Sequence, residues 1–213
     1  MTASEAAGRA GDADRAEDLA AVQRYGSGLL RRAADFCVEL LDGLPPLTRA
    51  DLARPTPCAL WNLHMLLLHL DDSLAALHEA VTDGSVRVVP PPGDPGRDLP
   101  ASLRDGARRL VNVWTDADRA GGVVMVGGCA VTAGVVAGAG AVELVVHGWD
   151  ISRSLGGDAR IPGPLAERLL RLAPLLIPGH ARAGLFGPPV PVPPDAQPTD
   201  RLVAFLGRAP EPG

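Results

Sequence analysis

Three residues of this chain have the types and spacing of a divalent-metal site: His69, Glu143 and His147. Glu143 and His147 are four residues apart in apolar, helix-type sequence, so their side chains stack on one helix face. Imidazole and carboxylate groups bind Zn²⁺ and related ions, and three protein ligands leave a coordination position open for water or substrate. The plain alternative is a buried Glu–His ion pair with His69 as a core histidine.

A helical wheel predicts that His69 points inward. At about 100° per residue, His69 shares the apolar side of its helix with Leu66 and Leu77. His64 and His78 fall on the opposite, solvent side by the same count, so we interpret them as surface histidines. The glutamate of the triad lies in an equally apolar helix, and a buried carboxylate is usually paired, protonated or bound to a metal.

Two aspartates near the triad are candidate catalytic residues. Asp72 lies about 60° from His69 on the wheel, and Asp150 lies almost one turn beyond the second histidine of the triad. Either carboxylate could accept a hydrogen bond from a ligand histidine or act as a general base. The alternatives are a solvated charge for Asp72 and an ion pair with Arg153 or Arg109 for Asp150.

Apolar spacing predicts the helices that position these residues. Helical patterns cover about 14–42, 62–82, 101–115 and 132–155, with Asn62 and Thr132 as expected N-caps, and shorter helices follow near Pro164 and over Pro198–Leu206. The segment LTRADLARPTPCALW predicts an irregular connector, and 122–131 a short extended segment. We expect an all-α four-helix bundle over residues 14–160, a disordered tail over 1–13, and short helices with a proline-rich strap over 161–213 packed on the bundle.

Composition narrows the function. The 213 residues are 46% hydrophobic and carry a net charge of −5, which favours a small-molecule partner over nucleic acid or membrane. All basic residues are arginines, so no lysine Schiff base can form. We expect no signal peptide and no membrane span, hence a cytoplasmic location, and the cysteines Cys37, Cys58 and Cys129 as small hydrophobes rather than disulfides.

Three motifs carry a resemblance: TPCALWNLHMLLLHL, ELVVHGWDISRSLG and FGPPVPVPPDAQPTDRLVAFLGR. With them, the chain resembles the DinB-like superfamily of metal-binding four-helix bundles, in the actinobacterial branch related to mycothiol-dependent maleylpyruvate isomerase. The resemblance implies that His69, Glu143 and His147 bind a divalent metal, most commonly zinc. It also implies that this metal activates a low-molecular-weight thiol such as mycothiol for isomerisation or S-transfer.

Three functions remain open at this point. The first is the thiol-activating metal enzyme; the second is a thiol-independent metal-assisted cyclase, hydrolase or lyase of a specialised biosynthetic pathway; the third is a non-catalytic metal-binding accessory protein. Trp61 and Trp149 flank the motifs, either as core residues or as walls of a substrate pocket. The resemblance and the exposed apolar helix faces leave room for a homodimer.

Overall fold

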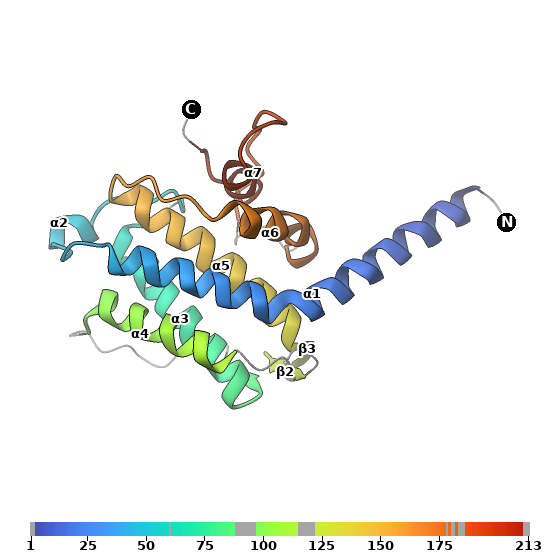
Figure 1. The fold of residues 1–213 in the computed structure, drawn as a ribbon, viewed down its shortest axis with the longest axis horizontal. Coiled ribbons are helices and arrows are strands. Elements are labelled where there is room, and N and C mark those ends of the chain that lie inside the picture. Colours follow the sequence, from blue (N-terminus) through green and yellow to red (C-terminus); the bar gives the residue numbers. More distant parts are fainter. Residues whose placement is uncertain are drawn as a thin grey trace.

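A four-helix bundle forms the body of the protein. The structure is a computed structural model that describes residues 3–59, 61–87, 97–114, 122–177, 179, 182 and 186–210. The bundle consists of α1 (Ala3–Asp42), α3 (Leu63–Thr82), α4 (Leu99–Val113) and α5 (Ala133–Ser154). Helices α1 and α3 each pack against both α4 and α5 (Figure 1). The expected all-α bundle is confirmed.

Helix α1 begins earlier than its apolar pattern predicts. It starts at Ala3 rather than near Asp14, and its N-terminal part extends away from the bundle (Figure 1). The structure therefore has helix within the segment 1–13 for which a disordered tail was predicted. The physical reason lies in composition, because alanine, glutamate and arginine are intrinsically strong helix formers even without an apolar stripe.

The connector before α3 is more ordered than its prolines suggested. It contains a short helix α2 (Arg49–Leu52), where Thr48 and Asp51 form a capping box. Asn62 caps α3, as predicted, by accepting a hydrogen bond from the backbone N–H of Met65 at 2.9 Å. Thr132 holds the N-cap position of α5 but makes no side-chain capping bond.

A small sheet lies at one end of the bundle. It contains β1 (Ser85–Val86), β2 (Val123–Val126) and β3 (Cys129–Thr132), in the order β1-β2-β3. Strand β2 runs parallel to β1 and antiparallel to β3. The hairpin of β2 and β3 accounts for the extended segment predicted over 122–131, and it leads directly into α5.

Helix α5 is the central helix of the core. A Cβ added to Gly26 of α1 would lie 2.2 Å from the carbonyl oxygen of Gly134, so glycine lets the two helices approach closely here. By length and composition alone, α5 is long and apolar enough to cross a membrane. Because 78% of its apolar window is buried inside the bundle, this is weak evidence for a membrane span.

The C-terminal helices share the hydrophobic core of the bundle. Helix α6 (Gly163–Leu176) packs on α1 and α5, and α7 (Pro198–Phe205) packs on α6. The proline-rich strap before α7 lies beside the C-terminal end of α7, because the N–H of Val190 donates to the carbonyl of Ala204 at 2.9 Å. Gly187 and Gly207 meet at this crossing, where a Cβ on Gly207 would lie 2.7 Å from the carbonyl oxygen of Gly187. This crossing places residues 186–187 and 207–208 against the site described next.

Candidate metal centre

Helices α3 and α5 bring His69, Glu143 and His147 together. The Oε2 atom of Glu143 lies 3.2 Å from Nε2 of His69 and 3.2 Å from Nε2 of His147. One potential ligand atom from each of the three residues lies within 4.8 Å of the others. Zinc–nitrogen bonds of about 2.0–2.1 Å in a tetrahedral site would separate neighbouring ligand atoms by about 3.3 Å. The donor types and the spacing of this triad therefore fit a divalent metal.

Burial decreases across the triad. The side chain of His147 is 5% exposed, that of Glu143 29% and that of His69 37%. The prediction that His69 points into the core is therefore only partly right: His69 lies at the edge of the apolar face of α3. Met65 and Leu68 are exposed, so they lie outside this face. The leucines of α3 that are buried in it are Leu63, Leu66, Leu67, Leu70, Leu74 and Leu77. The triad is thus anchored at His147 and open at His69.

A buried aspartate and arginine support His147 from behind. Oδ2 of Asp150 lies 3.0 Å from Nδ1 of His147, and Nη2 of Arg208 donates to the same oxygen at 2.8 Å. Both Asp150 and Arg208 are buried. A hydrogen bond from Nδ1–H to Asp150 leaves the Nε2 lone pair of His147 directed at the triad, as a metal ligand requires.

Asp150 therefore has an orienting contact with His147, and its ion pair is with Arg208 rather than with Arg153 or Arg109. Sequence reasoning missed Arg208. The available signal was its position near the end of the third motif, in LGR.

Opposing effects set the ionisation of the triad. Burial raises the pKa of Glu143, but hydrogen bonds from His147 and His69 and the charges on both rings outweigh burial, so the pKa lies well below its usual range. Burial lowers the pKa of His147, whereas Asp150 and Glu143 together raise it above its ordinary value. The ionised carboxylate of Glu143 is the form that binds a cation.

The triad lines a cavity of about 470 Å³. Trp61 lies edge-on to His69, with ring centroids 4.7 Å apart, and stacks on His147 at 6.0 Å. Trp61 is therefore a wall of this cavity, whereas Trp149 is buried. The remaining lining residues come from the connector before α3 and from the C-terminal crossing: Pro57, Cys58, Ala59, Phe186, Gly187, Gly207 and Arg208.

A second group of potential ligands shares His147. Cys58, His147 and Asp150 also offer ligand atoms within 4.8 Å of one another. Burial raises the pKa of the Cys58 thiol, against the neighbouring charge of Arg208. Asp150 is already engaged by Arg208 and by His147, so the group with Glu143 fits a metal better.

Asp72 lies on the exposed surface of α3, about one turn beyond His69. Among the described residues, no hydrogen bond or ion pair joins it to the triad. Its neighbour Asp71 accepts hydrogen bonds from Arg97 and Ser102, each at 2.7 Å. The structure thus brings Asp150 into contact with the triad, and a catalytic role for Asp72 stays a prediction.

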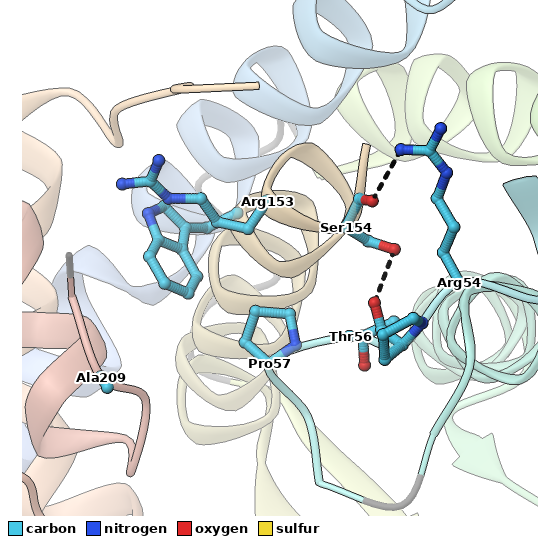
Figure 2. A pocket seen from close by; sticks show the side chains of 8 residues that line it. Arg54, Thr56, Pro57, Arg153, Ser154 and Ala209 are labelled. Atoms are coloured by element: carbon cyan, nitrogen blue, oxygen red, sulfur yellow. Dashed lines mark hydrogen bonds between the residues drawn. The ribbon is translucent and has the colours of Figure 1, made fainter. Parts of the chain in front are cut away.

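A second cavity, of about 580 Å³, shares Pro57 with the metal cavity. Figure 2 shows Arg54 reaching the carbonyl of Ser154 and the hydroxyl of Ser154 reaching the connector. These bonds measure 3.5 Å from Nη1 of Arg54 and 3.0 Å to the carbonyl of Pro55. The guanidinium of Arg153 lies 5.2 Å from the ring centroid of Trp149. These contacts fasten the connector to the end of α5, and this cavity contains no member of the triad.

Comparison with known proteins identifies the family of the segment that contains this site. The family model of the mycothiol maleylpyruvate isomerase N-terminal domain matches residues 30–152, which include the whole triad but not Arg208. Two uncharacterized proteins of Mycobacterium tuberculosis, from strains CDC 1551 / Oshkosh and ATCC 25618 / H37Rv, are each 28% identical over 181 residues, covering 84% of this chain and 94% of each relative. No solved structure matches the chain significantly. This chain belongs to the mycothiol maleylpyruvate isomerase N-terminal domain family, a DinB-like, metal-binding family.

Proposed function

We propose that this protein is a divalent-metal-dependent enzyme that activates a low-molecular-weight thiol of the mycothiol type. The reaction is S-transfer to, or isomerisation of, a small electrophilic metabolite. The observation that carries this proposal is the convergence of His69 and His147 on one oxygen of Glu143, each at 3.2 Å, at the wall of a cavity. The cavity volume of about 470 Å³ is in the range of small-molecule sites.

His69, Glu143 and His147 would hold the metal, with Zn²⁺ best suited to this donor set. A divalent ion bound there supplies positive charge that favours a thiolate over a thiol at neutral pH. Asp150 fixes the tautomer and orientation of His147, and Arg208 balances the charge of Asp150. Such supporting contacts hold ligand rings in place and raise metal affinity.

Family membership favours a thiol over an activated water as the nucleophile. A bound divalent metal would lower the pKa of a water as well as that of a thiol, so the metal alone does not separate the two. Among the described lining residues, Glu143 is the one carboxylate, and it belongs to the triad. The matching family model carries mycothiol in its name, so the thiol-independent cyclase, hydrolase or lyase is the weaker alternative. The non-catalytic accessory protein remains the alternative to any enzyme.

Metal analysis and thiol turnover test the proposal together. The purified full chain should contain about one equivalent of zinc or another divalent metal, lose it to a chelator, and then consume thiol only after reloading. Glu143→Gln should abolish both metal retention and turnover. His64→Ala is the matched control for His69→Ala, because His64 lies on the same helix but is exposed and outside the cavity. A protein that neither takes up zinc nor melts at a higher temperature with it refutes the proposal.

Glu143→Gln also separates the enzyme from the accessory protein. If the metal-loaded wild-type protein consumes thiol and the folded, metal-free variant does not, the accessory role is excluded. If no electrophile is turned over by any metal-loaded form, the accessory role is supported instead.

A further inference from the structure

Arg208 is the one arginine among the described residues that line the metal cavity, and its guanidinium already binds to protein groups. Its Nη2 and Nε atoms donate to the two carboxylate oxygens of Asp150 at 2.8 and 3.3 Å, and its Nη1 donates to the carbonyl of Leu206 at 2.8 Å. The side chains of Arg208 and Asp150 are 3% and 0% exposed. The charge of Arg208 is therefore balanced inside the protein before any ligand enters.

The remaining charges of the cavity also cancel when the proposed thiol is bound. A metal ligand histidine is neutral, so the two positive charges of a divalent ion meet one negative charge from Glu143 and one from a thiolate. The Arg208–Asp150 pair adds zero. The charges of the described lining residues, the metal and the thiolate therefore sum to zero where the second substrate enters.

Apolar groups form much of the wall that the second substrate meets. Trp61, Pro57, Ala59 and Phe186 line the cavity together with the backbone of Gly187 and Gly207. Phe186 also covers the guanidinium of Arg208, whose Cζ lies 5.7 Å from its ring centroid. A carboxylate buried against such walls without a partner is strongly disfavoured, whereas a planar apolar group is favoured.

Three nearby arginines lie outside the described lining of the metal cavity. Arg182 donates to the backbone carbonyls of Gly187 and Phe205. Arg54 pairs with Asp51 and donates to the carbonyl of Ser154, and Arg153 donates to the carbonyl of Gly157. Arg54 and Arg153 line the neighbouring cavity (Figure 2) and are absent from the described lining of the metal cavity.

We infer that the electrophile used by this protein is uncharged and largely apolar, not a dicarboxylate of the maleylpyruvate type. The inference rests on the proposed function, because it names the substrate class of the same thiol reaction. The inferred substrate class differs from maleylpyruvate, the compound in the name of the matching family model. The balanced Arg208–Asp150 pair acts as the specificity element.

The direct test compares two probes that share a planar frame and differ in charge: dimethyl phthalate and phthalate. Neither reacts with thiols, so binding is measured without turnover, by titration calorimetry on the zinc-loaded full chain saturated with 2-mercaptoethanol. The ester should bind at least about tenfold more tightly than the dianion. Equal or tighter binding of phthalate, or no binding of the ester at millimolar concentration, overturns the inference.

The same comparison on chelated protein distinguishes the two proposals. Failure of the proposed function appears as absent metal uptake or absent thiol turnover. The ester should still bind better to the metal-free cavity, because the Arg208–Asp150 pair and the apolar walls do not depend on a metal. A preference for phthalate there overturns the substrate inference while leaving the metal function intact.

Asp150→Asn gives a charge-specific control, because it leaves Arg208 unbalanced. The ratio of the two dissociation constants should move about tenfold toward phthalate. Asp71→Asn is the matched control: it removes an aspartate that pairs with Arg97 at 2.7 Å and lies outside the described lining of the metal cavity, and the ratio should not change. An unchanged ratio in folded Asp150→Asn protein overturns the role of the pair, and if that variant does not fold, the wild-type ratio alone decides.

Discussion

Replacement of Arg208 by methionine should destabilise the protein strongly, although Arg208 lies outside the bundle helices. The change keeps much of the side-chain volume but removes the guanidinium that bonds to both oxygens of Asp150. Asp150 is then a buried carboxylate whose remaining side-chain partner among the described residues is His147, at 3.0 Å. The loss of one partner leaves an uncompensated charge in the core.

The magnitude follows from burial. Removal of one partner of a buried ion pair costs about 3–5 kcal/mol, and no discount for solvent screening applies because both side chains are almost fully buried. His147 retains its contact with Asp150, so we expect the lower end, about 3 kcal/mol. For a chain of this size, about 1 kcal/mol corresponds to 2–4 °C in Tm, which gives a decrease of roughly 6–12 °C. Urea titration and calorimetry of metal-free protein measure it.

Two comparisons make the result specific. Arg97→Met breaks the pair of Arg97 with Asp71, whose arginine side chain is 46% exposed, and should cost less than about 1 kcal/mol. The double variant Arg208→Met with Asp150→Asn removes both charges and should recover much of the loss. A loss below about 1 kcal/mol for Arg208→Met, or a double variant whose loss equals the sum of the single losses, refutes the reasoning.

Other regions give sharper local predictions. Gly26→Ala should destabilise the protein by about 3 kcal/mol or more, because the new Cβ would lie 2.2 Å from the carbonyl oxygen of Gly134. Gly28→Ala has open space around its Cβ and should stabilise the protein by up to about 1 kcal/mol. Urea titrations measure both changes. Iodoacetamide at pH 8 should label the exposed Cys129 and spare Cys37 in peptide mass analysis. Burial raises the pKa of Cys37 to about 12, so its contribution to stability is complete below about pH 9 and is lost as pH rises toward 12. Cys37→Ala should remove that part of the alkaline decline, and an unchanged pH profile would contradict this assignment.

Local sequence patterns predicted what lies within single helices. Asn62 was recognisable as an N-cap because asparagine directly before an apolar helical pattern can accept a hydrogen bond from the N–H three residues ahead, as it does here. The four-residue spacing likewise put Glu143 and His147 on one face of α5. The inward direction of His69 was predicted less well. Its neighbours Met65 and Leu68 are apolar but exposed, so apolar residues border His69 on the solvent side too, and hydrophobicity alone does not mark the edge of the buried face.

Contacts between distant segments were beyond such patterns. Arg208 is 58 residues from Asp150, and their meeting depends on the path of the proline-rich strap and on the Gly187–Gly207 crossing. In a sequence with twenty arginines and no lysine, the one local signal for this arginine is its position near the end of the third motif, in LGR. Thr48 and Asp51 have the residue types and the spacing of the capping box at the start of α2. The nearby prolines favoured the prediction of an irregular connector instead.

The metal triad comes from one part of the chain, whereas the walls of its cavity come from that part and from the C-terminal segment. His69, Glu143 and His147 all lie in residues 30–152, the part that defines the family, whereas Phe186 and Arg208 reach the cavity from the C-terminal segment. A change at position 208 would therefore keep the ligand set and alter the charge that a second substrate meets. Family membership thus bears on the metal, whereas under the proposed substrate preference the C-terminal crossing would set which electrophile the cavity accepts.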